Sequence, residues 1–326
     1  MRNDRTSRRG SALLAVLWLS AALAAIAFSV ATSVRSETGR VSSSVDGLKA
    51  QYLASGAVER ALLYAEWGAR YRTPDGTPLY PYNIPRFVLQ FPSGQVDVEI
   101  VSETAKLNVN TSPPEDLFRL LAALGVEPGR AEQIVAGIVA WRSPAPPGAL
   151  DILEVQSSGP NPSFPPRHAS MEEIEELLFI QGVTPELFYG TYERDAQGVL
   201  RLHHGLRDCL SVYGGNPQVD VNTAQPEVLQ AVGLAPEQVD ALVRARSIKP
   251  FQNAAELTAL ASDLPGFQRL RIGMTTLETV RATARPRRPD GSLSDARRSV
   301  AALVKIMGQG VEPYHVLRWY GNVWVE

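Results

Sequence analysis

The residues best suited to chemistry in this chain are its single cysteine and its four histidines. His203 and His204 lie just before Cys209, and a thiolate beside an imidazole is the arrangement of a cysteine nucleophile. Adjacent residues on a strand point to opposite faces, however, and no acidic helper is indicated. His168 and His315 supply no metal-binding spacing. The sequence therefore predicts no catalytic constellation, no bound metal and no cofactor, which favours a protein that is not an enzyme.

A second place for chemistry is the boundary between a basic N-terminus and a long apolar stretch. Four arginines and one aspartate precede Gly10, and the 24 residues 11–34 carry no charged side chain. As a helix they would be about 36 Å long, enough to cross a hydrocarbon core of about 30 Å. The positive charge favours a cytoplasmic N-terminus and export of the rest of the chain.

Three interpretations of this N-terminus remain open. A secretory signal peptide would be removed after Ala25-Ile26-Ala27, although such apolar regions usually span only about 7 to 15 residues. A plain anchor would be kept whole. The order of basic residues, glycine, small residue and apolar helix resembles a type IV prepilin leader, which would be cut between Gly10 and Ser11. This third interpretation fits the order best, and it retains the helix in the mature protein.

The resemblance to prepilins makes Ala15 informative, because it would be the fifth residue of the mature protein. Most major pilins carry a glutamate there, and its partner in a filament is the N-terminal amine of a neighbour. A carboxylate in lipid is costly without a partner. A non-acidic residue at this position therefore suits a subunit at the tip, with no neighbour ahead of it.

An apolar stripe continues beyond the membrane segment at helical spacing. It consists of Val41, Val45, Leu48, Tyr52, Leu62 and Ala65. We expect one long helix that packs this stripe on a folded domain. The alternative is a separate soluble helix after a linker. Gly39 and Gly47 are compatible with it, because glycine weakens a continuous helix.

The middle of the chain contains an internal repeat. LNVNTSPPEDL at 107–117 recurs as VDVNTAQPEVL at 219–229, so that Asn110, Thr111, Pro114 and Glu115 match Asn222, Thr223, Pro226 and Glu227. Threonine suits an N-cap, proline the first turn, and glutamate the positive end of a helix dipole. We therefore predict two helix starts, with the threonines as caps. Each is followed by a glycine turn and a second helix, which resembles a helix-hairpin-helix, or SAM-like, unit.

Two further segments complete the predicted helical block. Residues 171–190 look like another helix pair, for which Ser170 and Glu173 could form a capping box. Residues 143–169 hold seven prolines, so they predict a long surface loop.

The flanking segments alternate apolar and polar residues, as strands do. Residues 86–103 predict a hairpin, and residues 275–285, 297–307 and 314–326 predict three more strands. The simplest packing is an α+β protein in which one antiparallel sheet lies on the N-terminal helix and the helical block is inserted between its strands. Arginines at 281, 285, 287, 288, 297 and 298 mark the turn between two of these strands, as a solvated hairpin or a docking patch for an acidic partner.

Helix-hairpin-helix units often bind DNA, so charge is informative. Residues 104–142 carry four basic and four acidic side chains, and residues 219–262 carry three and five. Phosphate binding depends on positive charge, and the whole chain has a net charge of −2. We therefore expect no nucleic-acid partner.

Taken together, RRGSALLAVLWL, AKLNVNTSPPEDL, VDVNTAQPEVL and EELLFIQGVTPELFY make the sequence similar to the minor pseudopilin K family of type II secretion systems (general secretion pathway protein K). The resemblance covers essentially the whole chain and implies a type IV pilin-like fold with inserted SAM-like units. It also implies cleavage by a prepilin peptidase, N-methylation of Ser11, anchorage in inner-membrane lipid, and minor pseudopilins I and J as partners at a pseudopilus tip. Some family members bind calcium in an acid-rich loop. Here that loop offers only Asp151 and Glu154, too few for the six to eight oxygens of a calcium site.

These observations divide the 326 residues into a leader, a membrane helix, a pilin-like part and two helical domains. The predicted boundaries are 1–10 for the leader, 11–34 for the membrane segment, 35–103 for the helix and first strands, 104–215 and 216–275 for the two SAM-like domains, and 276–326 for the last strands. The alternatives are a membrane-tethered DNA-binding protein of a competence or type IV pilus system, a minor pilin of another type IV system, and an exported enzyme.

Overall fold

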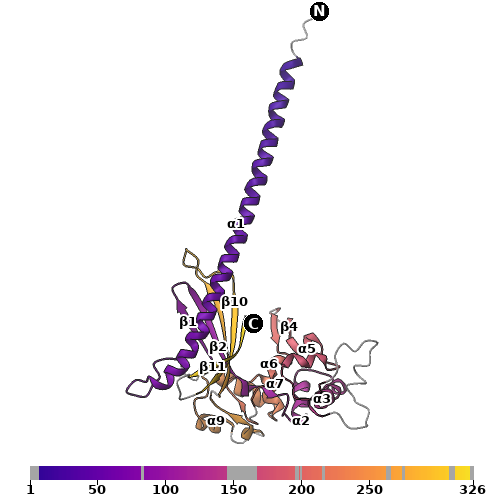
Figure 1. Cartoon of the computed structure of the whole chain (residues 1–326), viewed down its shortest axis with the longest axis vertical. Helices are drawn as coiled ribbons and strands as arrows, with labels where there is room; N and C mark the ends of the chain where they lie inside the picture. Colours follow the sequence, from indigo (N-terminus) through magenta and orange to yellow (C-terminus); the bar gives the residue numbers. More distant parts are fainter. Residues whose placement is uncertain are drawn as a thin grey trace, which may run out of the picture.

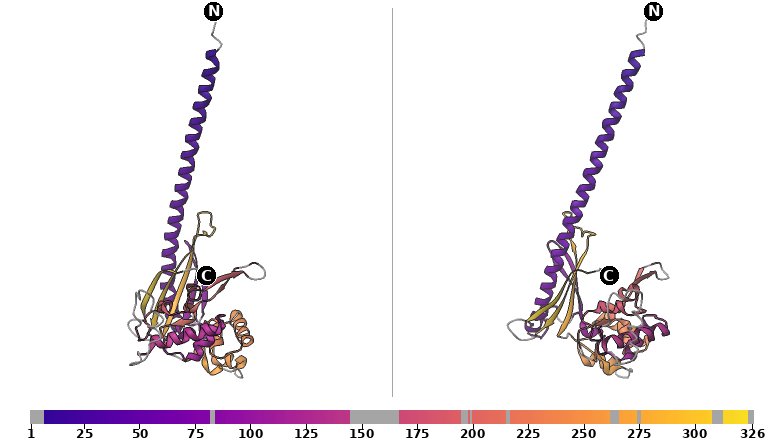
Figure 2. Two further views of the ribbon diagram at one scale, coloured as in Figure 1. Left: turned by 90° about the vertical axis from the view of Figure 1, so that its right-hand side faces the viewer. Right: turned by 45° about the vertical axis from the view of Figure 1, so that its right-hand side comes forward.

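The computed structural model describes residues 7–81, 84–144, 167–194, 198, 200–214, 217–261, 266–273, 276–307 and 313–323. A long N-terminal helix projects from a body formed by a β-sheet and a block of short helices (Figure 1, Figure 2). The elements are α1 (Ser7–Arg70), β1 (Arg86–Phe91), β2 (Gly94–Ser102), η1 (Glu103–Ala105), β3 (Leu107–Asn108), α2 (Pro114–Ala123), α3 (Pro128–Arg142), η2 (Ile174–Phe179), α5 (Pro185–Tyr189), β4 (Thr191–Arg194), β5 (Leu200–His203), α6 (Leu206–Cys209), β6 (Leu210–Ser211), β7 (Val219–Asp220), α7 (Pro226–Ala231), α8 (Pro236–Ile248), α9 (Ala254–Ala261), η3 (Phe267–Arg269), β8 (Leu270–Arg271), β9 (Leu277–Pro286), β10 (Arg298–Ile306) and β11 (Tyr314–Val323).

The main sheet has five strands in the order β1-β2-β9-β10-β11, and all its pairings are antiparallel. The predicted hairpin forms β1 and β2, with Leu89 opposite Val96. The other three predicted strands form β9, β10 and β11. Because β2 pairs directly with β9, the chain leaves the sheet after Ser102 and returns at Leu277. The predicted α+β arrangement of a long helix on an antiparallel sheet is confirmed, and it is consistent with a pilin-like fold.

Helix α1 is continuous, as predicted, but it packs on the sheet with a different face from the predicted one. Ala50, Ala54, Ala57 and Ala61 are buried against β2, β9 and β10. Small side chains at this spacing let the helix backbone approach the sheet closely. In the predicted stripe only Leu62 is buried and Ala65 is half-buried.

The rest of the predicted stripe lies on the opposite side of α1 from the sheet. Leu48 is 60% exposed and Tyr52 is 77% exposed, and Val41 and Val45 are exposed as well. The prediction that these residues pack on the domain is therefore wrong. Helical spacing identified an apolar face, but two apolar faces are present and the alanine face is the one that the sheet covers.

Two separate hydrophobic cores result. One lies between α1 and the sheet and includes Val98, Val280 and Ala302. The other lies inside the helical block and includes Leu120, Ile134 and Leu229. The N-terminal half of α1 contributes to neither core. Its apolar stretch beginning at Ala12 is the only one among the described residues long and apolar enough to cross a membrane.

Candidate functional site

The internal repeat corresponds to two helical units that are built alike. The first helical unit runs from β3 to β6, and the second runs from β7 to β8. Each unit closes through a two-residue parallel pairing, β3 with β6 and β7 with β8. The backbone N–H of Val109 donates to Ser211 O at 2.9 Å, and that of Val221 donates to Arg271 O at 3.0 Å. The start and end of each unit are thus held side by side.

The two repeated asparagines hold a distant backbone segment by the same pair of hydrogen bonds. Asn110 Nδ2 donates to Met171 O at 2.9 Å, and Met171 N donates to Asn110 Oδ1 at 2.7 Å. Asn222 Nδ2 donates to Phe251 O at 2.8 Å, and Phe251 N donates to Asn222 Oδ1 at 2.9 Å. Each amide therefore satisfies both polar groups of one buried residue, a job that a side-chain amide does by presenting a donor and an acceptor together.

A second repeated contact comes from arginines that the sequence comparison overlooked. Arg142, at the end of α3, donates to Val109 O at 2.7 Å and to Ser112 O at 2.9 Å. Arg246, near the end of α8, donates to Val221 O at 2.7 Å and to Ala224 O at 2.6 Å. Charged donors make stronger hydrogen bonds than neutral ones. Each unit thus ties the end of its long helix to the turn that carries the asparagine.

The predicted threonine caps are wrong, whereas the prolines lie where they were predicted. Pro114 and Pro226 are the first residues of α2 and α7, and the N-caps are Pro113 and Gln225, with no side-chain cap. A residue before proline is held extended, so the helix cannot begin earlier. Thr223 instead donates its hydroxyl to Asp220 Oδ2 at 2.5 Å, within the preceding turn.

The glutamates of the repeat, Glu115 and Glu227, lie in the first turns of α2 and α7. Glu115 is exposed, and Glu227 is half-buried. Oε2 of Glu227 is buried with no hydrogen-bond partner among the described residues. The two copies of this position therefore have different surroundings.

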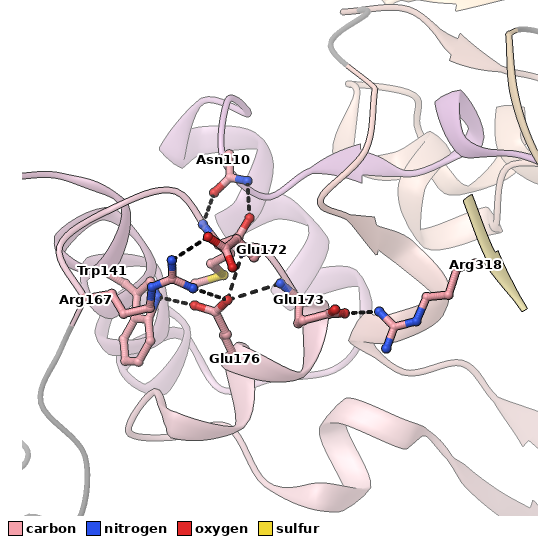
Figure 3. Close-up of polar contacts among 8 residues, drawn as sticks. Asn110, Trp141, Arg167, Glu172, Glu173, Glu176 and Arg318 are labelled. Atoms are coloured by element: carbon pink, nitrogen blue, oxygen red, sulfur yellow. Dashed lines mark hydrogen bonds and ion pairs between the residues drawn. The ribbon is translucent and has the colours of Figure 1, made fainter. Parts of the chain in front are cut away.

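The first unit has a polar cluster around Glu176 (Figure 3). Glu176 Oε2 accepts from Trp141 Nε1 at 2.9 Å, and Oε1 accepts from the backbone N–H of Glu172 at 2.8 Å and of Glu173 at 3.1 Å. Arg167 pairs with Glu176 at 3.3 Å and with Glu172 at 2.7 Å. The cluster fixes the start of η2, immediately after the residue that Asn110 holds.

This cluster replaces the predicted capping box of Ser170 and Glu173, which is wrong. The helical segment is a 3₁₀-helix that begins only at Ile174, so Ser170 lies outside it. On the opposite side of η2, Glu173 pairs with Arg318 of β11 (Figure 3). This ion pair links the first unit to the edge strand of the sheet.

Two buried carboxylates join the units to their surroundings. Asp116 on α2 pairs with Arg119 and, at 2.6 Å, with Arg269 of the second unit. Glu103, next to β2, accepts from Ser211 Oγ at 2.5 Å and from Thr279 Oγ1 at 2.6 Å. Asp116 therefore joins the two units to each other, and Glu103 joins the first unit to the sheet.

The environment of Glu103 favours its charged form. Burial alone would raise the pKa of this carboxyl, but the charge of Lys106 and the hydrogen bonds from Ser211 and Thr279 outweigh burial and lower it. In its charged form the carboxylate accepts both hydrogen bonds and so holds the first unit against the sheet. This contact weakens at low pH, when the Glu103 carboxylate is protonated.

Most cationic side chains in the two segments that resemble helix-hairpin-helix units already have partners. The lysines pair with glutamates, and the arginines donate to backbone carbonyls. The six engaged residues are Lys106, Arg119, Arg130, Arg142, Arg246 and Lys249. The seventh cationic side chain of these segments, Arg244, is not among the engaged residues. The contacts with carbonyls occupy donors of the arginines without cancelling their charge, so the argument against phosphate binding still rests on the balance of acidic and basic side chains in these segments.

The candidate nucleophile is also placed unfavourably for chemistry. Cys209 is fully buried, and burial raises the pKa of its thiol well above the usual value. The nearby His204 lies 3.7 Å from Asp208. Among the described residues, no group of three or more His, Cys, Asp or Glu side chains could hold a metal ion. Asp151 and Glu154 lie outside the described residues.

The predicted processing residues lie far from the body of the protein. Gly10, Ser11 and Ala15 belong to the N-terminal part of α1, and Ala15 is exposed. The structure does not bring them near the repeat motifs. Cleavage at Gly10 and the role of Ala15 stay predictions.

Two comparisons with known proteins found a similarity. The model of the protein family "Type II secretion system (T2SS), protein K" matches residues 219–277. The match spans the second helical unit and reaches the start of β9. It supports a minor pseudopilin K of type II secretion. The apolar part of α1 fits a single-pass inner-membrane protein of this kind.

Among solved structures, a chain of the GspK-GspI-GspJ complex from the type 2 secretion system of enterotoxigenic Escherichia coli is similar to this chain. It is 17% identical, the alignment covers 88% of this chain and 98% of that chain, and the TM-score is 0.49. No curated protein matches this chain.

Proposed function

We propose that this chain is a non-enzymatic minor pseudopilin at the tip of a type II secretion pseudopilus. The observation that carries the proposal is the protein K family match over residues 219–277. It coincides with a unit that is folded as a complete repeat and is closed by Asn222 and Arg246. The long helix on an antiparallel sheet supports the same assignment. The domain boundaries predicted from the sequence belong to this proposal.

The proposal includes processing by a prepilin peptidase between Gly10 and Ser11, with methylation of the new N-terminus. The mature helix would then stay in inner-membrane lipid, with the N-terminus on the cytoplasmic side and the body in the periplasm. The basic residues before Gly10 and the uncharged residues 11–34 support this orientation.

Minor pseudopilins I and J are the proposed partners, and α1 offers them an apolar face. Val41, Val45, Leu48 and Tyr52 are exposed on the side opposite the sheet. A face of this kind is buried when helices associate. Ala15, in place of an acid, suits a subunit with no neighbour ahead of it.

Mass spectrometry of the mature protein tests the proposal. We expect an N-terminus at Ser11 that carries a methyl group, and we expect Gly10→Leu to retain the leader. Ala15→Glu should reduce secretion, because it adds an unpaired carboxylate at the tip. A mature N-terminus near Ala27 would contradict the proposal, since the anchoring helix would then be lost.

A further inference from the structure

The connection between β9 and β10 carries a concentration of positive charge that the proposed function does not use. We call residues 285–298 the basic hairpin. Its five arginines at 285, 287, 288, 297 and 298 outnumber two aspartates at 290 and 295, for a net charge of +3 (5 − 2). Arg287, Arg288, Arg297 and Arg298 are exposed.

Few of these charges are neutralised within the chain. Arg288 pairs with Asp295 at 2.9 Å. Arg287 donates to Gly291 O at 2.9 Å, a contact that folds the tip without cancelling charge. No carboxylate of the described residues forms an ion pair with Arg287, Arg297 or Arg298. Arg297 lies in a pocket that Asp97 and Glu99 also line, and Arg298 lies against Gly47 of α1. Arg287 is therefore the unpaired guanidinium at the tip that is available to an external anion.

The basic hairpin lies at the end of the sheet that points along α1 toward the N-terminus (Figure 1, Figure 2). Ser294 Oγ donates to Asp46 Oδ2 of α1 at 3.0 Å. A Cβ atom on Gly47 would lie 3.4 Å from the guanidinium of Arg298. The hairpin is thus fixed beside the first turns of α1 that touch the body.

Helix geometry places this end of the body close to a membrane that holds residues 11–34. Asp46 lies twelve residues after Val34, or about 18 Å along the helix. The tip at Asp290 is four residues beyond Ser294 and reaches up to about 13 Å farther toward the N-terminus. The headgroup layer is roughly 5 to 7 Å thick. Arginine side chains at the tip can therefore reach headgroup phosphates.

We propose that the basic hairpin docks on anionic phospholipid headgroups at the periplasmic face of the membrane that anchors α1. The proposal rests on the proposed membrane anchorage. It gives the subunit a second membrane contact, which holds the body in one orientation around α1 until the subunit leaves the bilayer. An acidic protein surface is the other occupant that the charge would suit. The position beside the anchoring helix favours lipid.

The test uses the full chain in nanodiscs that contain a trace of lipid with a quencher on its headgroup. A fluorophore on Ser292→Cys reports the tip, since Cys209 is buried. We expect strong quenching with anionic phospholipid, weak quenching with purely zwitterionic lipid, and loss of the difference in high salt. Arg287→Gln/Arg288→Gln, which removes the two arginines at the tip, should lower the docking equilibrium by roughly fivefold for each charge removed.

Two control variants separate charge from other effects. Arg287→Lys/Arg288→Lys keeps the charge and should stay quenched. Arg72→Gln/Arg244→Gln removes two charges away from the hairpin and should change nothing. Equal quenching in both lipids, or no effect of Arg287→Gln/Arg288→Gln, would overturn the proposal and leave an acidic protein as the partner. A separate label on Ala24→Cys reports insertion of α1, so failure of the anchorage itself is seen independently.

Discussion

The two helical units are closed by the same kind of asparagine contact, but they enclose segments of different length. Asn222 holds Phe251, 29 residues later, whereas Asn110 holds Met171, 61 residues later. Closing a longer loop costs more entropy, by about 0.6 kcal/mol for each doubling of length. Both units carry a glutamate five residues after the held residue: Glu176 accepts from the backbone N–H of Glu172 and pairs with Arg167, and Glu256 accepts from that of Gln252 at 2.9 Å and pairs with Lys249 at 3.0 Å. Only Glu176 is buried, and it also accepts from Trp141. The comparison shows that the repeat fixes how a unit closes and leaves the intervening chain free to vary.

The largest effect is expected from removing the asparagine of the second unit. Asn222→Ala deletes both hydrogen bonds to Phe251 and leaves a buried N–H and C=O unpaired, at a cost of about 3 kcal/mol. Asn110→Ala should cost less, about 2 kcal/mol, because the buried Glu176, which also accepts from Trp141, holds the adjacent residues more firmly than the half-buried Glu256 holds Gln252. Hydrogen exchange of α7–α8 and of α2–α3 in the full chain measures the two local stabilities separately. An equal loss in both units would refute the idea that the Glu176 cluster supports closure.

The parts of the fold that the sequence predicted depend on local signals. Alternation of apolar residues and the turn at Pro92–Ser93 suffice for β1 and β2, because each is a property of neighbouring residues. Pro114 and Pro226 likewise mark helix starts directly. The repeat also pointed to Asn110 and Asn222, although their role proved to be long-range closure.

The failures concern contacts that only the folded chain defines. The buried face of α1 is made by alanines, whose weak hydrophobic signal is masked by the larger Leu48 and Tyr52. Arg142 and Arg246 also repeat, but the spacing from the asparagine to the arginine differs between the units. Simple alignment at one offset therefore misses them. Asp116 and Glu103 find their partners across 153 and 176 residues respectively, beyond any local pattern.

A smaller effect tests whether Asn110 and the Glu176 cluster act together. Trp141→Phe keeps an aromatic ring but removes the donor to Glu176 Oε2, at a cost of about 1 to 2 kcal/mol for the lost hydrogen bond. The smaller ring adds a cavity cost that every variant with this substitution shares. Combined with Asn110→Ala, the loss should exceed the sum of the two single losses by at least about 0.5 kcal/mol, because both side chains secure residues 171–173. Trp141→Phe with Asn222→Ala should be additive, since those residues lie in different units. Urea titration followed by local hydrogen exchange gives the five losses of stability that the two comparisons need, from three single and two double variants. If the losses of stability were additive in both double variants, the Glu176 cluster would not contribute to the closure that Asn110 makes.

The smallest expected effect is a pH dependence that only the second unit has. Asp220 occupies the position of Asn108 in the first unit, and burial raises its pKa above the usual 3.8 even though Thr223 and Arg246 act in the opposite direction. A raised pKa in the folded state contributes stability at low pH that is lost as pH rises from about 3.8 through the higher folded value. Asp220→Asn should flatten that decline in the second unit, as followed by hydrogen exchange of α7–α8 from acid to neutral pH. Asn108→Asp should create the same decline in the first unit.

Glu103 also titrates, and because its pKa is lowered, it makes the folded chain less stable as pH falls below 4.5. This contribution is the same in the parent chain and in both variants, so it cancels when they are compared. An unchanged slope in Asp220→Asn would show that burial of this carboxyl does not set the difference between the units.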